Sequence, residues 1–176
     1  MRADPRPLVG EPLALDLINT EWADVQGHHD LLRDIAGLKV WLESARQSAP
    51  VDAATLAALR NARSAIRGLV EQRDDVEARA GLNSVLAHGA WAQRLGPHGP
   101  ERVPACSEAH WALAWMAAAT LLDLLRDAPE RVRRCSGHDC LLAFYDTSRS
   151  GRRQWCSMAI CGNRAKARRH YHRSRT

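Results

Sequence analysis

The chain has 176 residues, of which 45% are hydrophobic and 26% charged, a composition typical of one soluble globular domain with a small appendage. No apolar run approaches the ~18 residues that a membrane span needs, and the opening MRADPRPLVGEP lacks the apolar core of a signal peptide, so we expect a cytoplasmic protein. The net charge of +5 is uneven: residues 131–176 hold 12 Arg or Lys and two acids, whereas residues 1–130 hold 13 basic and 18 acidic side chains, which predicts that the basic part meets a polyanion.

The first segments are predicted to be helical. Residues 11–22, EPLALDLINTEW, fit helix or strand, because Leu13 and Leu17 are spaced as on one helix face while the leucines also alternate as in a strand. We favour a helix there. Residues 30–47 carry apolar side chains at helical spacing, which predicts a second helix, divided at Gly37.

Three more helices and one extended region follow in the chain. Residues 51–73 form the clearest amphipathic helix, with Asp52 as its N-cap. A short helix is predicted over residues 77–88, and residues 91–106 hold two extended pieces around a Gly-Pro-rich centre, which fits a β-hairpin or an open loop. Residues 107–129 are apolar on most sides, which predicts the buried central helix of the body.

Four of the five cysteines form a regular pattern. Cys135, Cys140, Cys156 and Cys161 are arranged as C-x4-C-x15-C-x4-C. The short gaps let each pair wrap one edge of a tetrahedron, and the spacer is long enough for a hairpin that brings the pairs together. The pattern therefore predicts one structural zinc ion bound by these four cysteines. The fifth cysteine, Cys106, is expected to be a plain buried or half-buried thiol.

Other chemistries of paired cysteines fit this pattern less well. Disulfides are disfavoured in the cytoplasm, and a redox pair would need C-x-x-C beside a βαβ pattern. A catalytic zinc needs an open position, which four thiolates would close. A nuclease would need an acid beside a second, open metal site, and none accompanies Asn163 and His170, so we expect no enzyme activity.

The cysteines lie in a module predicted at residues 131–176, after a body at residues 1–130. Residues 141–146 are strand-like, a turn leads back to Cys156, and the segment after Cys161 is rich in helix formers, which is the order of a treble-clef or zinc-ribbon-like finger. About 40 residues bury too little surface to fold alone, so metal removal is expected to unfold the finger and spare the body. The predicted fold class is α+β, a mainly helical body with a small β element and this finger.

The C-terminal stretch resembles a known family. Residues 135–173 are similar to the CGNR zinc finger, whose name is read directly in residues 161–164. The body resembles the ABATE domain that precedes this finger in bacterial proteins, through GEPLALDLINTEW at residues 10–22 and LNSVLAHG at residues 82–89. The resemblance implies a stress-induced transcription regulator with a mixed α/β body, a zinc site and a DNA-binding finger.

The basic side chains of the finger point to nucleic acid independently of the resemblance. If the segment after Cys161 is a helix, its cations gather on two faces, and arginines of the predicted turn extend the patch. The planar fork of arginine suits phosphate oxygens and guanine edges, although one or two of these arginines are expected to neutralise the zinc centre instead. The predicted nucleic-acid-binding residues are Arg149, Arg152, Arg153, Arg164, Lys166, Arg168, Arg169 and Arg173.

The sequence leaves the partners open at two points. DNA is the favoured partner of the finger; the alternative is a module that binds RNA or a partner protein such as polymerase while the body senses a small molecule. The body itself fits an effector site, a dimer interface or a supporting role, and a homodimer with two basic helices about 34 Å apart would match one DNA turn. No membrane partner is expected.

Overall fold

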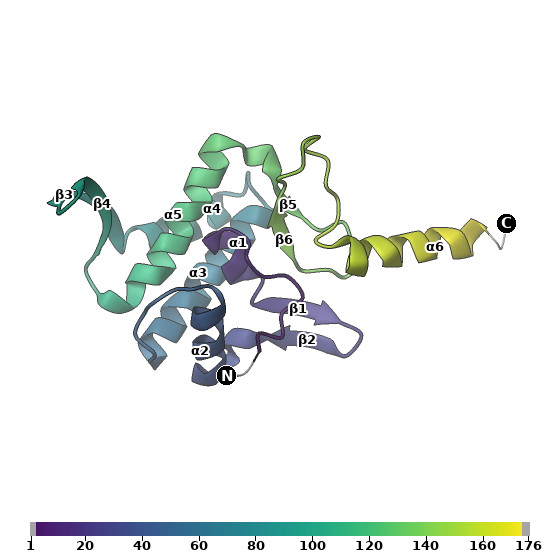
Figure 1. Ribbon diagram of the computed structural model, residues 1–176, viewed down its shortest axis with the longest axis horizontal. Coiled ribbons are helices and arrows are strands. Elements are labelled where there is room, and N and C mark those ends of the chain that lie inside the picture. The colour runs from purple at the N-terminus through teal and green to yellow at the C-terminus, as the bar shows by residue number, and fades with distance from the viewer. Residues whose placement is uncertain (1–2, 174–176) are drawn as a thin grey trace.

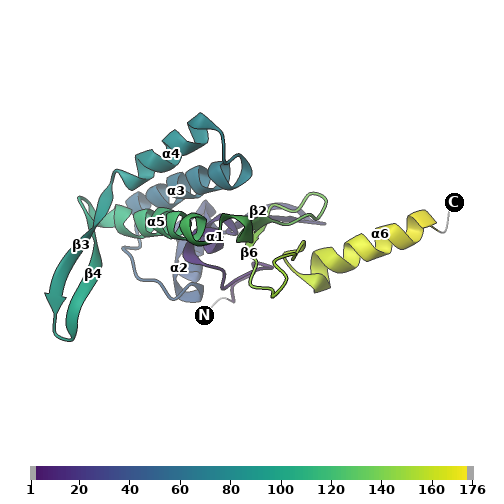
Figure 2. The same ribbon diagram turned by 90° about the horizontal axis from the view of Figure 1, so that it is seen from above.

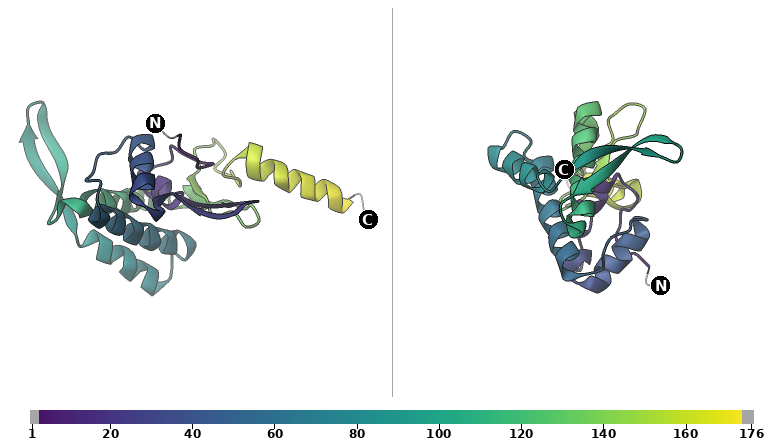
Figure 3. Two further views of the ribbon diagram at one scale, coloured as in Figure 1. Left: turned by 90° about the horizontal axis from the view of Figure 1, so that it is seen from below. Right: turned by 90° about the vertical axis from the view of Figure 1, so that its left-hand side faces the viewer.

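The computed structural model describes residues 3–173, with the side chains of residues 3–168. A helical body forms the centre, and two elements project from its opposite ends (Figure 1). One is the hairpin of β3 (Gly89–Gly96) and β4 (Gly99–Cys106), and the other is α6 (Asn163–Arg173). Figures 2 and 3 show the same two projections from above and from below. No helix in the described part of the chain is long and apolar enough to cross a membrane.

The body is built around one apolar core in which five helices meet. They are α1 (Leu13–Ile18), α2 (Ile35–Ser44), α3 (Ala53–Glu71), α4 (Val76–Leu86) and α5 (Ala112–Asp127). Leu15, Leu59 and Leu121 are completely buried between these helices. The carboxylate of Asp52 accepts a hydrogen bond from the N–H of Thr55 at 2.7 Å, which caps α3. The helices predicted at residues 51–73, 77–88 and 107–129 and the N-cap of α3 are confirmed.

The segment at residues 11–22 is helical over only part of its length. Helix α1 ends at Ile18, and the chain then turns into β1 (Glu21–Asp24), which pairs antiparallel with β2 (Gly27–Asp30). The alternating leucines lie in the helix, and the strand begins after them. The preference for a helix is therefore correct for α1 and wrong for the residues from Glu21 onward.

The predicted break at Gly37 is wrong. Helix α2 (Ile35–Ser44) follows a short 3-10 turn and begins after Asp34, whose carboxylate accepts a hydrogen bond from the N–H of Gly37 at 2.8 Å. A Cβ on Gly37 would lie 1.6 Å from the carbonyl oxygen of Leu31. The glycine is therefore needed for a close approach of two backbone segments, and Asp34 starts the helix.

The extended region near residues 91–106 is a regular antiparallel hairpin. Gly89 lies opposite Cys106 at its base, and Gly96 lies opposite Gly99 at its tip. The ring of Trp91 meets that of Trp115 on α5 edge-on, with 5.1 Å between centroids. Of the two predicted alternatives, the β-hairpin is the one that forms.

The finger, residues 131–173, contains one short hairpin and one helix. Strands β5 (Val132–Arg134) and β6 (Ala143–Tyr145) pair antiparallel, and the knuckle, residues 135–140, lies in the connection between them. The predicted pairing of residues 141–146 with the segment before Cys156 is wrong, because that segment bonds to the knuckle instead, with the N–H of Ser136 donating to the carbonyl of Gln154 at 2.9 Å. One π-helical turn, Met158–Gly162, leads into α6, so the predicted tail helix is confirmed.

Strand β6 is bonded directly to the body. The buried side-chain amide of Asn19 donates to the carbonyl of Ala143 and accepts from the N–H of the same residue, both at 2.9 Å. The carboxylate of Glu11 accepts from the N–H of Tyr145 at 2.8 Å. The side chain of Ala143 belongs to the apolar core of the body. Body and finger therefore pack together along β6.

Asn19→Ala is expected to destabilise the protein by about 2–4 kcal/mol, because it leaves the buried N–H and carbonyl of Ala143 without partners. Urea unfolding of the two proteins measures the difference. Asn61→Ala, an exposed asparagine on α3, is the matched control and should stay within about 0.5 kcal/mol of the wild type. Equal effects of the two substitutions would contradict the role of Asn19.

Candidate metal centre

Four cysteine sulfur atoms meet at the junction of the knuckle and α6. All four Sγ atoms lie within 4.8 Å of one another; the Cys140–Cys156 distance is 3.8 Å and the Cys156–Cys161 distance is 3.6 Å. In a tetrahedral zinc site with Zn–S bonds of about 2.3 Å, the sulfur atoms are about 3.8 Å apart. The structure thus brings the four predicted ligands, which include Cys135, to the spacing that one structural zinc ion requires.

The sulfur atoms lie too close together to ionise jointly without a cation. Hydrogen bonds from Cys140 and Cys156 lower the pKa of the Cys135 thiol to about 2. The contact with Cys135 in turn raises the pKa of Cys140 to about 12 and also raises the pKa of Cys156. One thiolate is stabilised by its protonated neighbours, and each further thiolate is opposed by the charge already present. A divalent cation compensates the charge of the thiolates and so removes their mutual repulsion. The four sulfur donors therefore suit a zinc ion.

Three N–H groups donate to the sulfur atoms. The backbone N–H groups of Gly137 and Cys156 lie 3.3 and 3.2 Å from Sγ of Cys135. The guanidinium of Arg164 lies 3.3 Å from Sγ of Cys161. Donors of this kind stabilise thiolates and tune metal affinity. Arg164 therefore acts as a counter-charge to the centre, a role that was expected of one or two arginines in the finger.

One of the two glycines beside the sulfur atoms, Gly137, allows their close packing. A Cβ at Gly137 would lie 2.9 Å from Sγ of Cys161 and 3.1 Å from Cβ of Cys140, so a side chain there would push the knuckle away from the centre. A Cβ at Gly162 would lie 2.6 Å from Sδ of Met158, whose thioether occupies that space. Met158 is exposed and its thioether can move aside, so Gly137, and not Gly162, is the glycine that the packing of the centre requires.

Apolar side chains from both parts of the chain enclose the centre. Trp22 of β1 and Phe144 of β6 are buried against the four cysteines. The guanidinium of Arg153 lies over the Phe144 ring, 4.1 Å from its centroid, and donates to the carbonyl oxygens of Trp155 at 2.9 Å and Cys156 at 2.5 Å. These contacts occupy the guanidinium of Arg153, which therefore stabilises the fold of the finger.

The loop between β6 and Cys156 is organised by Asp146. The buried carboxylate of Asp146 accepts from the N–H groups of Ser148 at 2.9 Å and Arg153 at 2.8 Å. The guanidinium of Arg133 donates to the carbonyls of Gly151 and Arg153 at 3.0 and 3.1 Å. The loop therefore has a defined path that carries its exposed arginines outward.

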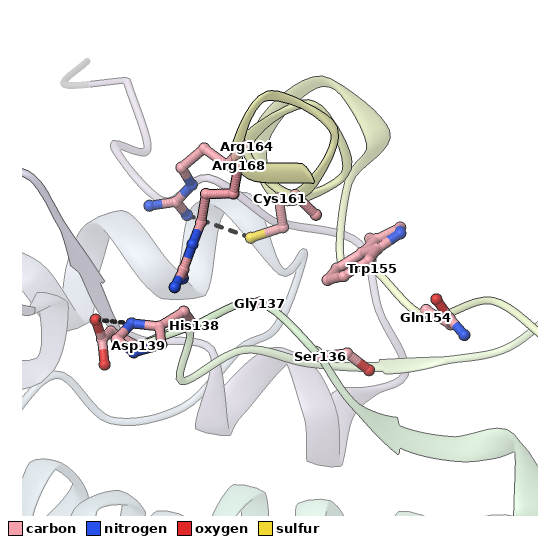
Figure 4. A pocket seen from close by; sticks show the side chains of 10 residues that line it. Ser136, Gly137, His138, Asp139, Gln154, Trp155, Cys161, Arg164 and Arg168 are labelled. Carbon is pink, nitrogen blue, oxygen red and sulfur yellow. Dashed lines mark hydrogen bonds and ion pairs between the residues drawn. The ribbon is translucent and has the colours of Figure 1, made fainter. Parts of the chain in front are cut away.

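The predicted nucleic-acid-binding residues fall into distinct groups. Five of them are exposed to solvent, two on the loop and three on α6: Arg149, Arg152, Arg164, Lys166 and Arg168. Figure 4 shows two of these, Arg164 and Arg168, projecting from α6 above the knuckle. Arg153 is half-buried in the contacts given above. The side chains of Arg169 and Arg173 lie outside the described residues.

Body residues for which no role was predicted contact the finger from more than one segment. From α3 and the residues just after it, Arg67 donates to the carbonyl of Leu141 and Arg73 to that of Val132. From the N-terminal segment, Glu11 and Asn19 bond to β6, and Trp22 packs on the cysteines. Glu11, Asn19 and Trp22 all lie in the segment GEPLALDLINTEW, and for these residues the clustering was the signal available in the sequence. Their directions could not be read from periodicity, because the chain changes from helix to strand within the segment.

Chelation of zinc is expected to expose both the finger and β1 to hydrogen exchange, because Trp22 packs against the cysteines. Helices α3 and α5 should stay protected, since their shared core does not contain the sulfur atoms. Hydrogen–deuterium exchange with mass spectrometry, before and after a chelator is added, measures both effects.

Two cysteine variants control this experiment. Cys140→Ser should mimic chelation and bind zinc at least about 100-fold more weakly, because it removes a ligand from the centre. Cys106→Ser changes a half-buried thiol at the end of β4 and should behave as the wild type. Full zinc affinity in Cys140→Ser, or equal loss of protection in α3 and the finger, would contradict this account.

Comparison with known families agrees with the geometry. The CGNR zinc finger family matches residues 131–174, and the ABATE family, described as "Putative stress-induced transcription regulator", matches residues 11–128. No curated protein matches the chain significantly. The second match spans more than half of the sequence. The chain therefore belongs to the ABATE family and carries, after its ABATE domain, a CGNR zinc finger whose four cysteines suit one structural zinc ion.

Proposed function

We propose that the chain is a transcription regulator that binds DNA through α6 and the loop beside it. The observation that carries the proposal is the placement of α6. This helix holds five Arg or Lys and no acid, begins at the metal centre and extends away from the body (Figure 1). An exposed basic helix of this kind gains free energy when it neutralises phosphates and releases their counterions.

The charges of α6 support a polyanion as its partner. Arg164 and Arg168 are four residues apart and share a helix face, where like charges destabilise an isolated helix by a few tenths of a kcal/mol. Helix α6 makes its main contacts with the π-helical turn that precedes it. Because the helix has no acid of its own and little support from the rest of the chain, an external polyanion would stabilise it.

The bonds between body and finger support a regulatory role. Asn19 joins the end of α1 to β6, and Trp22 joins β1 to the cysteines. A ligand or a second copy of the chain that moved α1 or β1 would therefore also act on the metal centre. The description of the ABATE family agrees with such a regulator.

Duplex DNA is expected to bind the zinc-loaded chain with strong salt dependence, about −0.9 in the slope of log K against log salt for each phosphate neutralised. Lys166→Ala/Arg168→Ala should make this slope less steep by up to about 1.8, because it removes two cations from α6. Fluorescence anisotropy with a labelled duplex, measured at several salt concentrations, provides the slopes.

The matched control is Arg79→Ala/Arg126→Ala, which removes two exposed arginines from the body and should leave the slope unchanged. Binding that does not respond to salt, or an equal effect of the two double variants, would contradict the proposal. Displacement of the duplex by an equal or lower concentration of structured RNA would assign the finger to RNA. Failure of the wild type to bind any nucleic acid would contradict the proposal and favour a protein as the partner of the finger.

We also propose that the finger has no nuclease activity. Among the residues whose side chains are described, the four cysteines are the one group of three or more His, Cys, Asp or Glu placed to hold a metal. Four thiolates leave no open position for a substrate or water. Supercoiled plasmid incubated with magnesium or manganese should stay intact. Nicking by the wild type that Cys140→Ser abolishes would overturn this expectation.

A further inference from the structure

The β3–β4 hairpin is a two-stranded sheet that projects from the body at the end opposite α6 (Figure 1). In the described part of the chain no third strand joins it. Each of its edges therefore carries backbone groups that no further strand uses. A two-stranded hairpin on its own is marginally stable in water, and an unpaired edge can accept another strand.

Two prolines of β4 show which residues of the hairpin direct their backbone groups outward. Pro100 lies opposite Leu95, and Pro104 lies opposite Trp91. Because proline has no N–H, neither pair can exchange the two hydrogen bonds of a hydrogen-bonded pair, so both are non-hydrogen-bonded pairs. The two kinds of pair alternate along an antiparallel ladder, so the pair at Gln93, halfway between them, is of the same kind. The N–H and carbonyl groups of Trp91, Gln93 and Leu95 therefore point away from β4.

The two edges of the hairpin differ in what they offer to another strand. On β4, Pro100 and Pro104 occupy outward positions and have no N–H to donate, so this edge is blocked in a way that proteins commonly use to protect sheet edges. On β3, the outward N–H and carbonyl groups of Trp91, Gln93 and Leu95 have no hydrogen-bond partner among the described residues. The hairpin therefore has one closed edge, on β4, and one open edge, on β3.

Exposed apolar side chains lie along the open edge. Leu95 is 81% exposed, and Trp91 is still 38% exposed although its ring meets that of Trp115. Side chains two positions apart on a strand share a face, so Leu95 and Trp91 lie on one face of β3 with Gln93 between them. Unpaired backbone groups and exposed apolar side chains thus occur together on this strand, as expected of a surface that binds another strand.

We propose that β3 pairs antiparallel with β3 of a second copy of the chain, with the two-fold axis at Gln93. In this register Leu95 of each copy lies beside Trp91 of the other, and an aliphatic side chain next to an aromatic one is a favourable cross-strand pair. The outward groups at residues 91, 93 and 95 exchange about six main-chain hydrogen bonds between the copies. Helix α6 lies at the opposite end of the body (Figure 1), so this pairing does not use it and is independent of DNA binding.

The charges and the closed edge favour a second copy as the partner. Arg94 lies opposite Ala92 of the second copy, so no like charges face each other, and its guanidinium bonds to Glu101 on its own β4 at 2.6 Å. The register that matches the apolar side chains therefore also keeps the cations apart. Because prolines block the edge of β4, the two hairpins together form a sheet that cannot extend further, and the pairing gives a closed dimer and not a fibre.

Two proline variants test the open edge. Gln93→Pro removes the outward N–H at the two-fold axis and should weaken the dimer at least about tenfold, because each copy loses one hydrogen bond of the central pair. Arg102→Pro makes the same change at the residue opposite Gln93, on the closed edge, and should stay within about twofold of the wild type. Neither N–H is bonded within the hairpin, so both variants should keep the fold. Sedimentation equilibrium over a range of protein concentrations measures the dissociation constants.

Cross-linking tests the register without a proline. In zinc-loaded Cys106→Ser protein, Gln93→Cys should form a disulfide between two copies under mild oxidation, since hydrogen-bonded partners of antiparallel strands lie about 5.5 Å apart, within the reach of a disulfide. Arg102→Cys in the same background should not, because it lies on the closed edge. A wild type that stays monomeric, assemblies larger than a dimer, equal weakening by the two proline variants, or equal cross-linking of the two cysteine variants would each refute the pairing. A dimer that does not link through residue 93 would refute it as well.

Discussion

The arrangement of the finger depends on an electrostatic constraint: four buried sulfur atoms lie within 4.8 Å of one another and cannot share that space as anions without a cation. A zinc ion satisfies the constraint and at the same time joins segments that have few other contacts. It links the knuckle to the start of α6, so the direction of that helix follows from the position of Cys161. The donors to the thiolates and Gly137, which lets the knuckle approach them, all stabilise this one centre.

Strand β6 connects the metal centre to the body through the alternation of its side chains. Ala143 lies in the core of the body, whereas Leu142 and Phe144 on either side of it lie against the cysteines. Successive side chains of a strand point to opposite faces. One face of β6 therefore packs in the core of the body, and the other packs against the cysteines of the finger. Asn19 bonds to its backbone at the same point. A finger of this size is too small for a core of its own, and it buries its apolar side chains against the body.

The arginines of the finger are divided between holding the structure and facing solvent. Arg153 stacks on Phe144, and Arg133 bonds to loop carbonyls, so neither guanidinium is free in the way that a count of charges implies. Arg164 is exposed, but its guanidinium bonds to Sγ of Cys161. Arg168 is exposed and has no hydrogen bond or ion pair among the described side chains. The positive charge of the segment thus overstates the number of side chains available to a polyanion.

The sequence alone determined the metal ligands, most of the helices and the basic character of the finger. Short gaps within each cysteine pair are a local property, and so are the N-cap of α3 and the apolar pattern of α5; each is read over a few neighbouring residues. The tertiary structure decided which strand pairs with β6, which arginines are free, and how body and finger join. Those outcomes depend on residues far apart in the chain, as with Asn19 and Ala143, which are separated by 124 positions. A partner at that distance leaves no periodic signal in either segment, because the bond exists only once the apolar core has brought the two together.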